Sequence, residues 1–173
     1  MRTILSSLLL AAGCLSAPLD ATAETRSPSP SWSEPGQQAL TAYETQARAL
    51  VAALQTGAGP EAVRPQGEAL IAIGIGLIDE FVARHPGCRD YLRAASAVRE
   101  QWPGLDHERI ERDFHRDAAL PSGREVKICY HLKDLIVHPA TALVLVHQSP
   151  ADYRQATHEI EEVIAHLSVV RAQ

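Results

Sequence analysis

Residues 129–148 read CYHLKDLIVHPATALVLVHQ, and this stretch decides the fold. Its apolar side chains show no period-two alternation, and with the residues just before it they predict a helix over 124–147. This helix is expected to be buried on most sides and to be interrupted or kinked at Pro139. On a helical wheel of about 100° per residue, most of the polar residues fall on one narrow stripe. The stripe consists of Lys127, His131, Asp134, His138 and Thr141, whereas Lys133 and His147 lie off it.

The polar stripe has two interpretations. The first is structural: a helix enclosed on most sides keeps one solvated strip, and its polar residues collect there. The second is functional, because two imidazoles with a carboxylate between them supply metal ligands or an acid/base pair. His131 and His138 are about 10 Å apart along a straight helix, too far to share one ion directly. Asp134 is close enough to pair with either of them.

A complete site needs ligands from elsewhere in the chain. The segment DFHRD at 113–117 lies just before the turn that leads into the helix over 124–147, so it can fold back over the polar stripe. The predicted ligand residues from these two segments are His115, Asp117, His131, Asp134 and His138. Imidazole and carboxylate groups suit a divalent metal ion, whose identity stays open, or a small polar ligand.

The C-terminal segment HEIEEVIAH at 158–166 contains His158, Glu162 and His166 at four-residue spacing and offers a further histidine–carboxylate pair in His158 and Glu162. On the wheel these two residues lie nearly opposite the apolar stripe of their helix, so we expect this face to be solvated. The motif H-E-x-x-H is absent, which leaves a zinc-protease mechanism without support.

Catalytic motifs are absent from the sequence. No serine or cysteine stands in a recognisable nucleophile setting, and there is no G-x-S-x-G. We therefore assign no catalytic residue and lean away from an enzyme. A hydrolase or lyase that depends on histidine and aspartate is the weaker alternative.

Apolar residues at 3-4 spacing predict the other helices. These helices cover about 35–55, 65–84, 88–101 and 152–170, with a short helix over 106–117. Gly74 and Gly76 lie in the second of them, where we expect close helix–helix contact. No segment alternates convincingly at period two, so the predicted fold is an all-α helical bundle of four main helices plus one or two short ones.

The N-terminus carries an export signal. Arg2 precedes a short apolar segment, and Ala21-Thr22-Ala23 fits a cleavage site, so residues 1–23 are a predicted signal peptide. The alternative is a lipoprotein signal with lipid attached to Cys14. Residues 24–33 are predicted to be a flexible leader and 34–173 the helical domain. The protein is therefore expected in the periplasm or secreted, or else anchored through Cys14.

Export leaves Cys88 and Cys129 as the cysteines outside the signal region. Two cysteines in an oxidising compartment predict one disulfide bond. A pair of metal-binding thiolates is the competing interpretation, but no C-x-x-C accompanies them.

Charge and hydropathy limit the partners. The formal net charge is −5, and no cluster of Lys and Arg is visible, which speaks against nucleic-acid binding. No apolar segment of the predicted mature protein is long enough to be a transmembrane helix. We expect an exported binding or accessory protein that holds a divalent metal or small ligand. The alternative is a structural or interaction module, with an envelope protein as partner and no ligand site.

Overall fold

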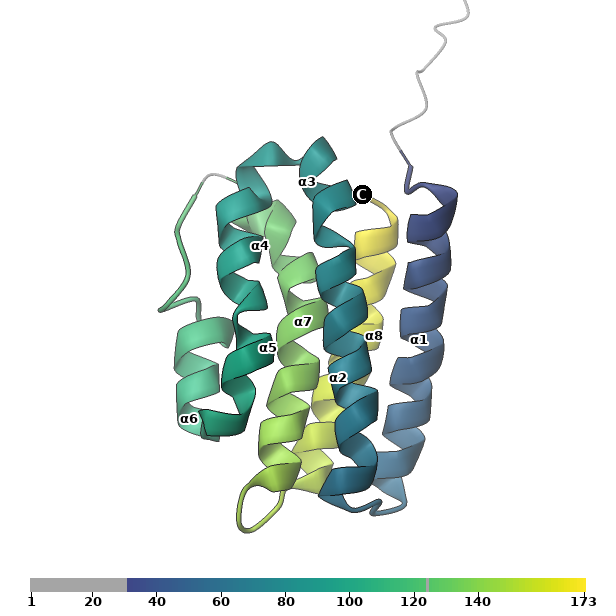
Figure 1. The fold of residues 1–173 in the computed structure, drawn as a ribbon, viewed down its shortest axis with the longest axis vertical. Helices are drawn as coiled ribbons and strands as arrows, with labels where there is room; N and C mark the ends of the chain where they lie inside the picture. The colour runs from purple at the N-terminus through teal and green to yellow at the C-terminus, as the bar shows by residue number, and fades with distance from the viewer. Residues whose placement is uncertain (1–30, 124) are drawn as a thin grey trace, which may run out of the picture.

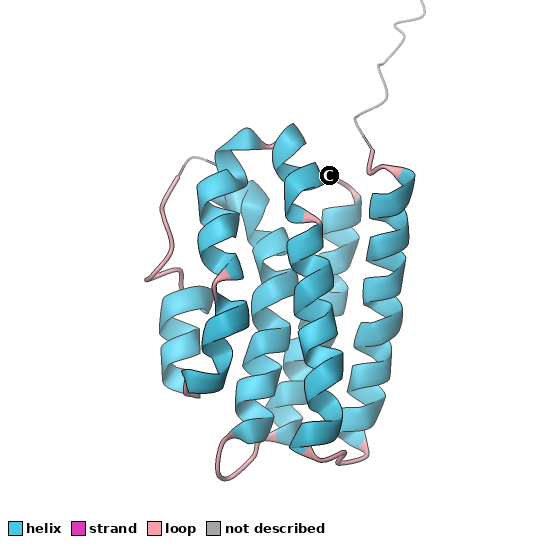
Figure 2. Cartoon of the chain, viewed as in Figure 1, coloured by secondary structure: helices cyan, strands magenta, loops and turns pink. Residues whose placement is uncertain are grey.

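The computed structural model describes residues 31–123 and 125–173, and within these ranges every regular element is a helix (Figure 2). The predicted signal peptide, the alternative lipid attachment at Cys14 and most of the predicted leader lie outside the described residues. In the described part of the chain, no helix is both long and apolar enough to cross a membrane.

Four long helices form the bundle, as predicted for an all-α fold (Figure 1). They are α1 (Glu34–Gln55), α2 (Pro60–Gly76), α7 (Val126–His147) and α8 (Tyr153–Arg171). Helix α7 packs against α2 and α8, and α1 packs against α2 and α8 on the other side. This arrangement makes α7 the central helix, in agreement with its apolar sequence.

Short helical segments connect α2 to α7, and all of them except α3 pack against the remaining side of α7 (Figure 1). They are α3 (Ile78–Arg84), η1 (Pro86–Cys88), α4 (Arg89–Ser96), α5 (Val98–Gln101), η2 (Trp102–Gly104), α6 (His107–Ile110) and η3 (Glu111–His115). They are more numerous than predicted, because the helix expected over 65–84 begins at Pro60 and is divided at Leu77. The helix expected over 88–101 is similarly divided at Ala97.

The start of α1 shows that the predicted leader was too long at its C-terminal end. Trp32 is buried in the core, and its indole N–H donates to the carbonyl oxygen of Val170 at 2.8 Å. Ser33 is the N-cap of α1, where its hydroxyl accepts from the backbone N–H of Gly36 at 3.2 Å. A cap of this kind is typically worth about 1 kcal/mol. Trp32 and Ser33 therefore belong to the folded domain.

Helix α7 runs without interruption through Pro139, where the sequence predicted an interruption or a kink. Proline has no N–H, so the carbonyl oxygen of Leu135, four residues earlier, loses its helical partner. The buried hydroxyl of Tyr43 in α1 donates to that carbonyl oxygen at 2.7 Å. The side chain of a neighbouring helix thus supplies the hydrogen bond that the proline removes.

Glycine at position 74 permits close contact between α2 and α7. A Cβ atom at Gly74 would lie 2.9 Å from the carbonyl oxygen of Leu135, which is too close for a side chain. The expected helix–helix contact is therefore present at Gly74. It is not present at Gly76, where a Cβ atom would meet nothing within 4 Å.

The two cysteines join the short segments to α7. Cys88 of η1 and Cys129 of α7 have their sulfur atoms 2.06 Å apart, the bonding distance of the disulfide that the cysteine count predicted. Both residues are fully buried. The bond fixes the first turn of α7 to the chain 41 residues earlier.

Candidate metal-binding site

The polar stripe of α7 is buried for most of its length, so its interpretation as a solvated strip is wrong there. Asp134 and Thr141 are fully enclosed and His138 is 3% exposed, because α8 and η3 cover this side of the helix. His131 is partly buried, and Lys127 at the start of the helix is exposed as a solvated strip requires. The polar side chains consequently meet other polar side chains, and they do so in two groups.

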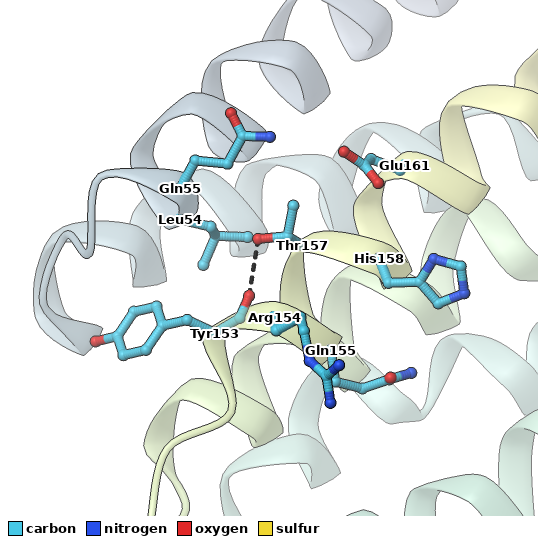
Figure 3. A pocket seen from close by; sticks show the side chains of 8 residues that line it. All are labelled: Leu54, Gln55, Tyr153, Arg154, Gln155, Thr157, His158 and Glu161. Atoms are coloured by element: carbon cyan, nitrogen blue, oxygen red, sulfur yellow. Dashed lines mark hydrogen bonds between the residues drawn. The ribbon is translucent and has the colours of Figure 1, made fainter.

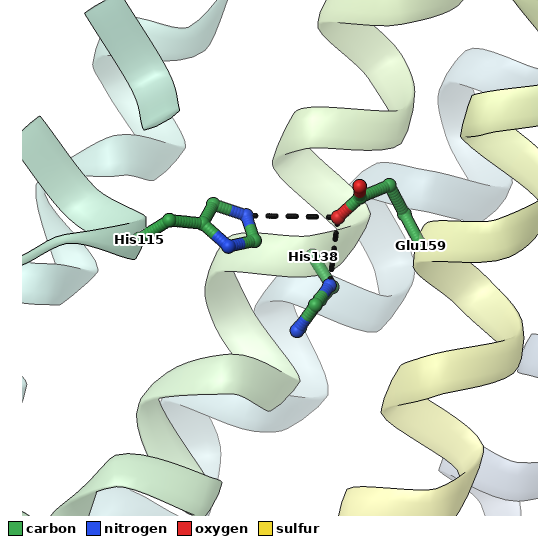
Figure 4. A group of neighbouring side chains, drawn as sticks. All are labelled: His115, His138 and Glu159. Atoms are coloured by element: carbon green, nitrogen blue, oxygen red, sulfur yellow. Dashed lines mark hydrogen bonds and ion pairs between the residues drawn. The ribbon is translucent and has the colours of Figure 1, made fainter. Parts of the chain in front are cut away.

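The first group, here called cluster I, consists of His115, His138 and Glu159 (Figure 4). His115 comes from the end of η3, His138 from the middle of α7 and Glu159 from the second turn of α8. Oε2 of Glu159 lies 2.7 Å from Nδ1 of His138 and 3.6 Å from Nε2 of His115. One ligand atom from each of the three residues lies within 4.8 Å of the other two.

The second group, cluster II, consists of His131 and Asp134 of α7 and His166 of α8. Nδ1 of His166 lies 2.7 Å from Nδ1 of His131 and 3.2 Å from Oδ2 of Asp134. These ligand atoms also lie within 4.8 Å of one another. Cluster II adjoins cluster I, since the ring centroids of His138 and His166 are 5.4 Å apart.

A π-helical turn brings His115 to cluster I. The backbone N–H of Arg116 donates to the carbonyl oxygen of Glu111, five residues earlier, at 2.9 Å. This spacing inserts one extra residue into the turn, a local irregularity that is frequent at functional sites. Nε2 of His115 also lies 2.9 Å from the hydroxyl of Thr141, which alternatively donates to the carbonyl oxygen of Val137 at 3.1 Å. The single hydroxyl hydrogen of Thr141 can serve only one of these two atoms, so when it is donated to Val137, Nε2 of His115 is the donor to Thr141.

Asp117, predicted as a ligand, lies in neither cluster. Its carboxylate accepts from Nζ of Lys133 at 3.1 Å and from the hydroxyl of Tyr91 at 2.9 Å. Its φ of 59° places it in the left-handed region, which aspartate tolerates better than most residues. Asp117 thus attaches the segment after η3 to Tyr91 of α4 and to Lys133 of α7.

Lys133 is fully buried although it lies off the polar stripe. Its ammonium donates to the carbonyl oxygens of Phe114 and His115, at 3.0 and 3.1 Å, and to the carboxylate of Asp117. Isolated buried charges are costly, so a buried lysine requires such partners. The consequence for the site is that α7 holds the backbone of His115 in place.

Burial keeps two of the imidazoles neutral. Burial, with a further contribution from the charge of His138, lowers the pKa of His115 to about 3. Burial, together with the charges of His138 and His131, lowers the pKa of His166 to about 4. A metal ion binds the neutral imidazole, so neither ring has to lose a proton near neutral pH.

The two carboxylates respond differently to their surroundings. Burial on its own would raise the pKa of Glu159, but the hydrogen bond and charge of His138 and the charge of His115 outweigh it and lower the pKa. Burial raises the pKa of Asp134. Glu159 is therefore an ionised ligand group at neutral pH, whereas burial disfavours the charged form of Asp134.

Among the residues that the structure describes, three buried polar atoms in the clusters have no hydrogen-bond partner: both carboxylate oxygens of Asp134 and Nε2 of His138. Nζ of Lys133 is 3.3 Å from Oδ1 of Asp134, within the range of an ion pair but without hydrogen-bond geometry. A buried polar atom without a partner typically costs about 1–3 kcal/mol. The cost of the two Asp134 oxygens would be offset by a bound cation.

Four of the five predicted ligand residues fall in the clusters, and two further members come from α8. Glu159 was not singled out from the sequence, and His166 was noted only as part of a face expected to be solvated. Both occupy the heptad register of the buried residues Val163 and Val170, which is the signal that marks them as inward-facing. The expectation of a solvated face holds for His158, which is exposed and pairs with Glu162 at 3.2 Å.

A surface pocket between α1 and α8 contains no residue of either cluster, although its lining residue Gln155 donates to Oε1 of Glu159 at 2.8 Å (Figure 3). It is lined by Leu54, Gln55, Tyr153, Arg154, Gln155, Thr157, His158 and Glu161. The hydroxyl of Thr157 is occupied by the backbone carbonyl oxygen of Tyr153 at 2.7 Å. Neither cluster contributes a residue to this pocket, so it is not the candidate site.

Comparisons of the chain with protein-family models, with characterised proteins and with solved structures found no match. The assignment of a function therefore depends on the chemistry of the two clusters.

Proposed function

We propose that this protein is an exported helical binding protein that holds a divalent transition-metal ion at cluster I. The observation that carries the proposal is the convergence of His115, His138 and Glu159, from three separate elements, with their ligand atoms within 4.8 Å of one another in a largely buried setting. Export is supported by the N-terminal sequence alone.

The chemistry of the ligand atoms favours zinc, copper or nickel. Imidazole suits these ions, and carboxylate oxygen completes sets of this kind in zinc proteins. Three protein ligands also leave one position of a four-coordinate ion for water or another ligand. Magnesium and calcium prefer all-oxygen sets and fit the two histidines poorly.

The spacing of the ligand atoms is compatible with such an ion. Two ligand atoms bound at about 2.0–2.1 Å in a tetrahedral arrangement lie about 3.3 Å apart. Oε2 of Glu159 lies 2.7 Å from Nδ1 of His138 and 3.6 Å from Nε2 of His115, one distance shorter and one longer than this value. Side-chain movements of less than about 1 Å would therefore complete the site without a change of fold.

Calorimetric titration tests the proposal. The protein, without an affinity tag and treated with a chelator, is titrated with Zn²⁺ and compared with Glu159→Gln, which keeps the shape of the side chain and removes its charge. We expect the wild-type protein to bind zinc and to gain about 2.7 kcal/mol of stability at a free zinc concentration of 100 times Kd. Glu159→Gln is expected to bind at least tenfold more weakly at this cluster.

The matched control is His158→Ala, which removes an exposed histidine from the same helix and leaves both clusters intact. It is expected to retain wild-type binding. If the wild-type protein neither binds zinc, copper or nickel nor gains stability from them, the metal proposal is wrong. The bundle would then be a structural or interaction module, which is the alternative from the sequence.

A further inference from the structure

We infer that cluster II is a second metal site, so that the protein holds two divalent transition-metal ions side by side. This inference rests on the proposed function, because it assigns the same class of ion to a neighbouring set of ligands. His131, Asp134 and His166 supply two imidazole nitrogens and one carboxylate oxygen. None of the three belongs to cluster I, so each ion has ligand residues of its own.

Three polar atoms meet at cluster II, and their side chains cannot supply a hydrogen bond for each contact between them. Nδ1 of His166 faces both Nδ1 of His131, at 2.7 Å, and Oδ2 of Asp134, at 3.2 Å. A ring nitrogen carries at most one hydrogen, so His166 can donate to one of these atoms but not to both. A cation between the three atoms would accept a lone pair from each of them.

Lys133 does not supply the missing hydrogen bond to Asp134. An ammonium group has three hydrogens. In Lys133 they match three acceptors, the carbonyl oxygens of Phe114 and His115 and the carboxylate of Asp117. Asp134 has no exposed surface, and neither of its oxygens has a hydrogen-bond partner within 31–123 and 125–173. The Lys133 ammonium lies 3.3 Å from Oδ1 of Asp134 without hydrogen-bond geometry, so a cation coordinated by this carboxylate would supply the partner that Lys133 does not.

The ligands of cluster II need a small adjustment to hold an ion. Two imidazole nitrogens on one tetrahedral ion lie about 3.3 Å apart, so the rings of His131 and His166 would have to separate by roughly 0.6 Å. Both rings are only partly buried, which leaves room for this movement. Asp134, which is enclosed, keeps its position on α7.

The arrangement along the helices keeps the two sites distinct. On α8, Glu159 of cluster I and His166 of cluster II are seven residues apart, two turns of helix on the same face. On α7, the ligands of cluster II come one to two turns before His138. The ring of His138 lies between the sites, since its centroid is 4.7 Å from that of His115 and 5.4 Å from that of His166.

Metal stoichiometry tests the inference. Chelator-treated protein is loaded with Zn²⁺, freed of excess metal and measured by native mass spectrometry and elemental analysis, with far-UV circular dichroism to verify the fold. We expect two ions in the wild-type protein and in the control His158→Ala. One ion is expected in His166→Ala and one in Glu159→Gln, and none in the double variant. Asp134→Asn replaces His166→Ala should the latter fail to fold, and is expected to hold one ion.

The outcomes separate this inference from the proposed function. One ion in the wild-type protein that is retained in His166→Ala and lost in Glu159→Gln overturns the second site and leaves cluster I standing. One ion that is lost in both variants reveals a single shared ion and also overturns the second site. One ion retained in Glu159→Gln and lost in His166→Ala overturns the proposed function of cluster I. No ion in the wild-type protein overturns both.

Discussion

The buried ammonium of Lys133 donates a hydrogen bond to the main-chain carbonyl oxygen of His115 at 3.1 Å. This contact joins the central helix α7 to the π-helical turn that presents a ligand of cluster I. A charged side chain that packs within the core therefore positions the imidazole of a residue 18 positions away in the sequence.

Lys133→Met tests this relationship. The substitution removes three hydrogen bonds, the cation bound by Asp117 and the ammonium that lies 3.3 Å from Oδ1 of Asp134. Removal of one partner from a buried ionic group typically costs about 3–5 kcal/mol. We expect a loss of this size in the free energy of unfolding measured with urea, and at least tenfold weaker zinc binding. The exposed Lys127→Met on the same helix should change neither quantity, and equal effects of the two variants would contradict the positioning role.

Tyr43→Phe tests the bond that replaces the missing proline N–H in α7. Loss of the hydroxyl leaves the carbonyl oxygen of Leu135 buried without a partner, which costs about 1–3 kcal/mol. Urea unfolding should show this loss, with no change in helical content by circular dichroism. Tyr153→Phe, at the surface pocket, is the control. Unchanged stability in Tyr43→Phe would mean that the carbonyl oxygen does not depend on Tyr43.

The stability of the metal-free protein should fall as the pH is lowered below about 6.5. In the folded protein the pKa of His115 is about 3 and that of His166 about 4, whereas in the unfolded chain both titrate near 6.5. Between these values the unfolded chain binds protons that the folded protein does not, so lowering the pH decreases the free energy of unfolding. The contribution of these two neutral imidazoles to the free energy of unfolding is complete above pH 6.5, and it is lost progressively as the pH falls to about 3–4.

Urea unfolding of the metal-free protein between pH 7.5 and 5 measures this effect, in a range where most carboxylates remain ionised. The variant His115→Gln should show a shallower fall in stability with pH than the wild-type protein. Identical pH dependence of the two proteins would show that His115 is not held neutral by its surroundings.

The disulfide between Cys88 and Cys129 should contribute about 2–4 kcal/mol to stability, the usual range for a loop of this length. Urea unfolding with and without a thiol reductant, and of the double variant Cys88→Ala/Cys129→Ala, measures the contribution. Zinc binding should survive reduction, because neither sulfur belongs to a cluster. Loss of zinc binding on reduction would show that the bond also positions the ligands.

The fold was predictable from α7, because apolar residues occupy nearly the whole circumference of this helix. A helix of this kind is buried, which places it at the centre of the bundle. For the same reason His131, Asp134 and His138 stood out, as ionisable residues in an apolar helix. The break of the helix expected over 65–84 at Leu77 was not predictable from the apolar spacing, which continues across it.

The composition of the site was only partly predictable, because it depends on which faces of separate helices meet. Glu159 lies in an amphipathic helix with many charged residues, where nothing in its residue type distinguishes an inward carboxylate from an outward one. Asp117 had the right residue type and location, but the backbone turn at that position directs it to Lys133 and Tyr91 instead. The division of the histidines into two clusters is a property of the packing of α7 against α8 and η3.

Anomalous X-ray diffraction at the zinc edge, from crystals of the zinc-loaded protein, tests the central claim most directly. The proposed function predicts an anomalous peak within about 2.0–2.2 Å of a nitrogen of His115, a nitrogen of His138 and a carboxylate oxygen of Glu159. Zinc found only at the exposed pair of His158 and Glu162, or nowhere on the protein, would contradict it.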